Sequence, residues 1–196
     1  MKLIIGLGNP EQRYHGTRHN VGFMMLDAYA TGHSLQFSGK TKFSAEIAEY
    51  VAEDEKVLLV KPTTYYNESG QSVRALVDFY NLDPRRDVLV IHDDMALPFS
   101  TIRTREKGSD AGNNGIKSLN SHIGPDYARV RIGIYNDLRE RMDAADFVLA
   151  KFSQDENQQF PQIAEKVTDM INDFIADHFT STSHTSNSEQ QKSASE

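Results

Sequence analysis

The chain alternates between short apolar runs and longer segments in which apolar residues recur every three or four positions. Uninterrupted or alternating apolar runs are typical of strands, and a repeat near 3.6 residues is typical of helices. We expect strands at residues 3–5, 43–51, 56–60, 88–91, 101–105 and 129–134. We expect helices at residues 21–31, between 70 and 83, and at 114–122, 144–152 and 155–179. Asn20 can cap the first helix, and Pro161 predicts that the regular part of the last one begins near Phe160.

The alternation of strands and helices predicts the fold class. One hairpin, with its turn at residues 52–55, interrupts an otherwise regular order. Such an order predicts an α/β protein, a single-domain three-layer α/β/α sandwich around a mixed, largely parallel twisted sheet. The continuous apolar run at 88–91 is typical of a central strand covered on both faces.

The composition changes after Phe179. Residues 180–196 are mostly Ser, Thr, Asn and Gln, with one alanine as the only apolar residue. Because so polar a segment cannot bury enough surface to offset the entropy of ordering it, we expect a disordered tail. The folded domain is therefore predicted to span residues 1–179.

Composition narrows the class of protein further. The chain has 196 residues, enough for a substantial core, and no cysteine, which excludes a disulfide framework and a thiol nucleophile. The first apolar run is too short for a signal peptide, and no run approaches the length of a membrane span. We therefore expect a cytoplasmic protein with no membrane partner.

Charge is distributed unevenly along the chain. The net charge is −7, which argues against bulk, nonspecific binding of nucleic acid. Residues 102–141 nevertheless carry eight basic and five acidic side chains, so this segment is +3 and the remainder is −10. A local basic face suits a polyanionic substrate, and it is equally compatible with ordinary solvated strand faces.

Five polar residues stand near predicted strand ends or helix starts, where open α/β sheets bind ligands. They are Asn9, His19, Asn67, Asp93 and Asn114. An imidazole backed by a carboxylate can deprotonate water, and side-chain amides can donate hydrogen bonds to a developing oxyanion. The set favours direct hydrolysis of an activated acyl bond, such as an ester, without a covalent intermediate.

Other interpretations of these residues remain open. An early pair of glycines could begin a dinucleotide-binding motif, although Glu11 occupies the third glycine position. His15 and His19 have a metal-ligand spacing, and the acidic pair Asp93 and Asp94 could bind magnesium. The asparagines could instead be helix caps or turn residues.

Five ordered segments resemble the successive motifs of the bacterial peptidyl-tRNA hydrolase family. They are GLGNP followed by Tyr14, TRHN and GF; KPTTYYNESG; HDDMALP; GSDAGNNG; and RVRIGI. The resemblance covers roughly residues 2–179. It implies a catalytic domain that cleaves the ester between a peptide and the 3′ ribose of tRNA and so recycles tRNA during translation. It also implies that the protein is a monomer that needs no metal or cofactor. The expected partner is the acceptor end of peptidyl-tRNA rather than DNA.

The resemblance implies roles for individual residues. His19 would be the general base that activates water, and Asp93 the carboxylate that orients it. Asn9 would distinguish blocked from free aminoacyl-tRNA by recognising the peptide backbone. The other expected contacts are Asn67 and Asn114 at the peptidyl end, Tyr14 and Tyr65 at the terminal adenosine, and Arg103, Arg105 and Arg131 at the tRNA phosphates.

Several positions depart from the family pattern. Tyr66 stands where methionine is usual, and Asn113 replaces a histidine. The other departures are Glu11, Ala96, Ala111 and the Tyr135-Asn136 pair. Because the catalytic pair is intact, we expect an active enzyme whose contacts with the 3′ end and the tRNA surface differ in detail.

Two alternative functions compete with this interpretation. One is an RNA-binding module, like plastid relatives that act as splicing factors. The other is a metal-dependent hydrolase that uses His92, Asp93 and Asp94 as ligands. A binding module has no use for a base with its orienting carboxylate, and activity in excess EDTA would exclude the metal-dependent hydrolase.

Overall fold

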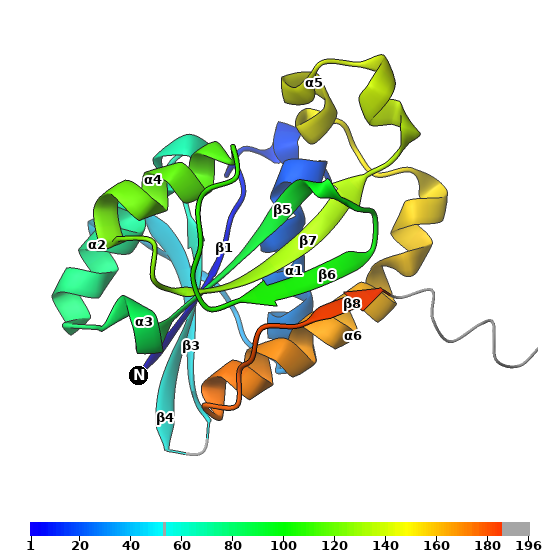
Figure 1. Cartoon of the computed structure of the whole chain (residues 1–196). Helices are drawn as coiled ribbons and strands as arrows, with labels where there is room; N and C mark the ends of the chain where they lie inside the picture. The colour runs from blue at the N-terminus through cyan, green and yellow to red at the C-terminus, as the bar shows by residue number, and fades with distance from the viewer. Residues whose placement is uncertain (53, 186–196) are drawn as a thin grey trace, which may run out of the picture.

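The described part of the chain forms one mixed β-sheet with helices on both faces (Figure 1). The computed structural model describes residues 1–52 and 54–185. The strands are β1 (Lys2–Gly6), β2 (Ser38–Lys40), β3 (Ala45–Ala52), β4 (Glu55–Pro62), β5 (Val88–Pro98), β6 (Thr101–Arg105), β7 (Ala128–Tyr135) and β8 (Ser183–Thr185). The α-helices are α1 (Val21–Gly32), α2 (Ser69–Tyr80), α3 (Pro84–Asp87), α4 (Asn114–Ile123), α5 (Ala144–Leu149) and α6 (Gln154–Ile175). Short 3₁₀ turns lie at η1 (Gln12–Tyr14), η2 (Arg18–Asn20), η3 (Thr41–Phe43), η4 (Tyr66–Glu68) and η5 (Asp137–Arg141).

The strand order is β2-β3-β4-β1-β5-β7-β6-β8. Parallel pairs join β4, β1, β5 and β7 in the middle of the sheet. Antiparallel pairs extend one edge through β3 and β2 and the other through β6 and β8. The predicted fold class, a mixed and largely parallel sheet, is therefore confirmed.

Two hydrophobic clusters fill the spaces between the sheet and its helices. Because successive side chains of a strand point to opposite faces, β1 contributes to both clusters. Ile4 joins the cluster with α1 and α6, whereas Leu3 and Ile5 join the cluster with α2 and α4. This packing produces the three predicted layers. In the described part of the chain, no helix is both long and apolar enough to cross a membrane.

Strand β5 extends farther than predicted. The apolar run ends at Ile91, but the strand continues to Pro98 because it keeps pairing with β7. Asp93 lies opposite Ile132, and the register shifts only between Asp94 and Pro98. Asp93 is therefore held within a strand rather than in a loop after it, which restricts the position of its carboxylate.

Helix α6 begins within one residue of the predicted start at 155, and it is α-helical from its first turn. Ser153 accepts a hydrogen bond from the backbone N–H of Glu156, and the Glu156 carboxylate accepts one from the backbone N–H of Ser153. This capping box starts the helix at Gln154, so the expectation that regular helix begins near Phe160 is wrong. Pro161 lies inside the helix.

The prediction of a disordered tail is wrong for its first residues. Strand β8 pairs with β6, and the Thr104 hydroxyl donates to the Thr180 carbonyl at 2.6 Å and accepts from the Thr182 N–H at 2.6 Å. These backbone and hydroxyl contacts need no apolar side chains, so composition does not reveal them. Residues 186–196, the rest of the predicted tail, lie outside the described residues.

The start of α1 lies very close to the central strands. A Cβ at Gly22 would lie 2.4 Å from the Ile91 carbonyl oxygen, so glycine permits this approach. The prediction that the Asn20 side chain caps this helix is wrong, since it makes no capping hydrogen bond. The side-chain amide of Asn20 instead forms two hydrogen bonds with the backbone of Asn9. It accepts from the N–H and donates to the carbonyl, each at 2.9 Å. The loop after β1 is thereby tied to the turn that carries His19.

A buried ion pair anchors the same turn to α6. The guanidinium of Arg18 donates to both carboxylate oxygens of Glu156, at 2.9 and 2.8 Å. It also lies over the rings of Phe147 and Phe152, with its carbon 4.7 and 4.8 Å from the ring centres. Burial alone would raise the pKa of Glu156, but hydrogen bonds from Arg18 and from the Ser153 backbone outweigh it and lower the pKa. The ion pair therefore fixes Arg18, the residue next to His19, to the first turn of α6.

We predict that Arg18→Met lowers the free energy of unfolding by about 3–5 kcal/mol at pH 7, because it leaves the buried Glu156 carboxylate unpaired. Arg13→Met is the control, since Arg13 and Glu11 form an exposed pair whose loss should cost far less than the loss of the buried pair. Denaturant titration measures both values. A loss below about 1 kcal/mol for Arg18→Met would contradict the anchoring role.

The same variant has a predicted pH dependence. The lowered pKa of Glu156 means that its stabilising contribution is complete above the usual glutamate pKa and is lost as pH falls through the folded-state pKa. The difference in stability between the wild type and Arg18→Met should therefore narrow as the pH falls below about 4. A difference that widens towards acid pH would contradict the ion pair as its source.

Candidate active site

A cleft of about 1160 Å³ opens beyond the carboxyl ends of the central parallel strands. Its walls come from the loop after β1, from η2, η4 and β5, from the loop before α4, and from α5. The predicted site residues that line it are Asn9, Tyr14, His19, Tyr65, Asn67, Asp93, Arg105, Asn114 and Arg131. Arg103 is not among the lining residues. Topology therefore gathers residues from across the sequence at the edge of the sheet where ligands of α/β proteins bind.

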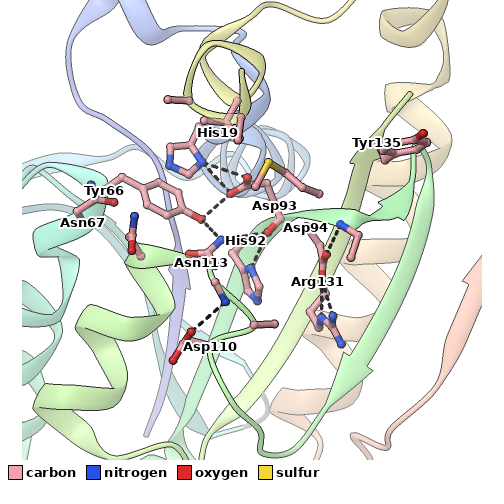
Figure 2. A pocket seen from close by; sticks show the side chains of 18 of the residues that line it. His19, Tyr66, Asn67, His92, Asp93, Asp94, Asp110, Asn113, Arg131 and Tyr135 are labelled. Carbon is pink, nitrogen blue, oxygen red and sulfur yellow. Dashed lines mark hydrogen bonds and ion pairs between the residues drawn. The ribbon is translucent and has the colours of Figure 1, made fainter. Parts of the chain in front are cut away.

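His19 and Asp93 line the cleft and form a hydrogen-bonded pair (Figure 2). Nδ1 of His19 lies 3.0 Å from each carboxylate oxygen of Asp93. The His19 side chain is 15% exposed and that of Asp93 is 2% exposed. Because a carboxylate can only accept, Nδ1 carries the proton and Nε2 is the basic nitrogen. The pair can thus take a proton from a water molecule in the cleft.

Asp93 is a buried carboxylate with several donors around it. Tyr66 donates its hydroxyl to Oδ1 of Asp93 at 2.5 Å. Burial by itself would raise the pKa of Asp93, but the His19 ring and the hydrogen bonds from His19 and Tyr66 outweigh it and lower the pKa. Asp93 is therefore charged throughout the neutral range and can stabilise a positive charge on His19.

Asn9 is buried, and hydrogen bonds hold its backbone and its side-chain oxygen. Its backbone is bonded to Asn20, and its side-chain Oδ1 accepts the backbone N–H of Tyr66 at 2.9 Å. This bond sets the direction of the Asn9 amide, because the oxygen must face Tyr66. The other end of the amide is an NH₂ group, which can only donate to a ligand.

The remaining polar residues lie around the mouth of the cleft. Asn67 belongs to η4 and Asn114 begins α4, and both are exposed. Tyr65 is 50% exposed and donates its hydroxyl to Glu11 at 2.6 Å, whereas Tyr14 is partly buried. Exposed amides and phenol rings at a cleft mouth are available to a ligand, in contrast to the buried groups beneath them.

The three expected tRNA-contacting arginines differ in their surroundings. Arg131 lines the cleft but forms an ion pair with Asp94, with Nε 2.7 Å from Oδ2. Arg105 also lines the cleft and donates to the Thr104 carbonyl at 2.7 Å. Arg103 lies outside the lining, and its Nε donates to the Ser183 hydroxyl at 3.2 Å. The structure therefore brings two of the three arginines to the cleft.

Two residues of the site have roles that sequence reasoning did not anticipate. Arg129 is buried and donates to the carbonyls of Gly108 and Ser109, each at 2.7 Å, which holds the loop before α4. Burial lowers the pKa of His92 to about 4, and its Nδ1 lies 2.8 Å from the Asp93 carbonyl. His92 is therefore neutral. For Arg129, the one signal available in the sequence was its place in the alternating strand at 129–134.

The alternative metal site receives no support from the side-chain geometry. Among the described residues, no three His, Cys, Asp or Glu side chains are grouped so that they could hold an ion. Asp94 is paired with Arg131, and Asp93 is occupied by His19 and Tyr66.

Comparison with known proteins relates the whole chain to one family. The family model described as peptidyl-tRNA hydrolase matches residues 3–194. A peptidyl-tRNA hydrolase of Fusobacterium nucleatum is 43% identical over 176 residues, covering 90% of each chain. One of Ligilactobacillus salivarius is 43% identical, covering 89% of this chain and 93% of the relative. The crystal structure of peptidyl-tRNA hydrolase from Acinetobacter baumannii superposes with a TM-score of 0.82 at 31% identity, covering 90% of this chain and 89% of the other. This chain therefore belongs to the peptidyl-tRNA hydrolase family.

Proposed function

We propose that this protein hydrolyses the ester bond between peptide and tRNA in peptidyl-tRNA, without a metal, and so recycles tRNA during translation. The observation that carries the proposal is the His19–Asp93 pair, in which the buried carboxylate leaves Nε2 of His19 as a base facing the cleft. Membership of the family supports the choice of substrate. The cytoplasm and a monomeric state are the setting we expect for this activity.

The chemistry follows from the tautomer of His19. Nε2 takes a proton from water as the water oxygen attacks the ester carbonyl, and the resulting imidazolium is stabilised by the Asp93 carboxylate. A tetrahedral oxyanion forms, to which the cleft amides Asn67 and Asn114 can donate. The bond to the ribose 3′ oxygen then breaks, and the imidazolium returns its proton to that oxygen. The products are tRNA and the peptide acid, which releases its proton to solvent and becomes a carboxylate.

Selectivity for blocked substrates follows from the direction of the Asn9 amide. Its oxygen is taken by the Tyr66 N–H, so the NH₂ end is left to face the substrate. A peptide carbonyl can accept from that group, whereas the ammonium of a free aminoacyl-tRNA has only donors. Two opposed donors in a partly desolvated cleft repel each other, so a free aminoacyl ester would bind poorly.

The expected tRNA contacts are two tyrosines at the mouth of the cleft and three arginines in or near it. Tyr14 and Tyr65 are available for contact with the terminal adenosine. Arg105 and Arg131 line the cleft and would contact phosphates of the acceptor end, and Arg103, outside the cleft, would contact phosphates farther along the stem. A few such contacts predict binding that weakens with salt.

We predict that His19→Ala reduces the rate of hydrolysis of N-acetylated aminoacyl-tRNA by about 10²–10⁴-fold, the usual contribution of a general base. Asp93→Asn should reduce it less, because the imidazole remains and only its orientation and charge stabilisation are impaired. Single-turnover kinetics with both variants measures the two losses, and retained tRNA binding shows that the fold is intact. A His19→Ala rate above a tenth of the wild-type rate would exclude His19 as the base.

Asn9→Asp tests the selectivity argument. The substitution preserves an acceptor for the Tyr66 N–H but replaces the NH₂ donor with a second acceptor oxygen. We expect the rate ratio of blocked to free aminoacyl-tRNA to fall by about tenfold or more, the cost of opposing a buried hydrogen-bonding group with a mismatched one. Asn9→Ala is the control, and it should slow the blocked substrate without accelerating the free one. An unchanged ratio in Asn9→Asp would remove Asn9 from discrimination.

A further inference from the structure

Two departures from the family pattern contact each other beside the catalytic pair. Nδ2 of Asn113 donates to the Tyr66 hydroxyl at 2.9 Å, and that hydroxyl donates to Oδ1 of Asp93 at 2.5 Å. The Tyr66 ring also stacks on the His19 ring, with centres 3.4 Å apart and planes 15° from parallel. Figure 2 shows Tyr66 between Asn113 and the His19–Asp93 pair. Tyr66 therefore touches both members of that pair with two different parts of its side chain.

The structure makes room for a tyrosine at this position. Tyr66 is 2% exposed, and its ring packs against the start of α4. A Cβ at Gly115 would lie 2.3 Å from Cε1 of Tyr66, so any larger residue at position 115 would displace the ring. The backbone N–H of Tyr66 is bonded to Asn9. Both ends of Tyr66 are thus fixed within the site.

The direction of each hydrogen bond that links Asn113, Tyr66 and Asp93 is determined. Oδ1 of Asn113 accepts the backbone N–H of Ile116 at 3.0 Å as the cap of α4, so its Nδ2 must be the end that faces Tyr66. The amide nitrogen can only donate and the Asp93 carboxylate can only accept, so the single hydroxyl proton of Tyr66 goes to Asp93. Burial, followed by the charge of Asp93, raises the pKa of Tyr66 well above its usual value, so this proton is retained.

We propose that Tyr66, oriented by Asn113, is a positioning residue for His19 and Asp93 in this protein. Its hydroxyl fixes the rotation of the Asp93 carboxylate, and its ring fixes the plane of the His19 imidazole. The carboxylate needs such support because both of its oxygens lie 3.0 Å from Nδ1 of His19, so that contact alone does not select one rotation. This inference rests on the proposed function for its kinetic consequence, although the contacts themselves are independent of it.

Tyr66→Phe is the decisive variant, because it keeps the stacked ring and removes the hydroxyl alone. We expect kcat for N-acetylated aminoacyl-tRNA to fall by about tenfold, the worth of one hydrogen bond to a charged group. KM should stay within about twofold, because a buried hydroxyl bonded to Asp93 contributes to orientation rather than to substrate affinity. The second readout is the proton resonance of His19 Nδ1–H, assigned by its absence in His19→Ala. It should move downfield, because Asp93 no longer shares its charge with Tyr66.

Asn113→Ser provides an independent test that does not alter Tyr66. Serine can still cap α4 but cannot reach the Tyr66 hydroxyl. We expect a smaller fall in kcat, and no additional fall when the substitution is combined with Tyr66→Phe, because both act through one hydroxyl. Tyr127→Phe is the matched control, since it removes a buried tyrosine hydroxyl that donates to Asn120 outside the cleft. It should leave kcat and the resonance unchanged.

The outcomes distinguish this inference from the proposed function. A wild-type protein that fails to hydrolyse the substrate refutes the proposed function, and the resonance still reports whether Tyr66 restrains the pair. An active wild type with either readout unchanged in Tyr66→Phe overturns the positioning role. If Tyr66→Phe does not fold, an unchanged kcat or an unchanged resonance in Asn113→Ser overturns it instead.

Discussion

The buried carboxylate of Asp93 is the constraint on which the rest of the site depends. A charged group removed from water is costly unless donors surround it, and Asp93 obtains them from His19 and Tyr66. Satisfying the carboxylate therefore sets the tautomer of His19 and the position of the Tyr66 ring. The ring in turn requires glycine at position 115 of α4. One electrostatic requirement thus links β5, η2, η4 and α4.

Hydrogen bonds and an ion pair hold the loops around the His19–Asp93 pair in place. The loop after β1 is bonded to Asn20, and the turn with His19 is anchored through Arg18 to Glu156 on α6. A base that must meet water and an ester carbonyl in one geometry gains from supports whose own positions are fixed. A separate bond from the Tyr66 backbone N–H sets the direction of the Asn9 amide, so the proposed base and the proposed discriminating residue are held by one connected set of contacts.

Local patterns in the sequence predicted much of the fold but few of its long-range contacts. Apolar periodicity located the central strands and most helices because those segments bury one face or both. It ended β5 too early, since the strand continues through polar residues by pairing with β7. Arg18 is an ordinary loop residue in the sequence, and its partner Glu156 is 138 positions away. The docking of β8 depends on backbone hydrogen bonds, which composition does not encode.

The site was predictable to a similar degree. Loop position and chemistry singled out Asn9, His19 and Asp93, and the structure brings them into one cleft. The contact between Tyr66 and Asn113 could not be predicted, because nothing local in either segment indicates that they meet. The most direct test of the whole account is hydrolysis by the wild-type protein of N-acetylated and free aminoacyl-tRNA, side by side in excess EDTA. We predict cleavage of the N-acetylated substrate alone. Cleavage of both at similar rates, or loss of activity on chelation, would contradict the account.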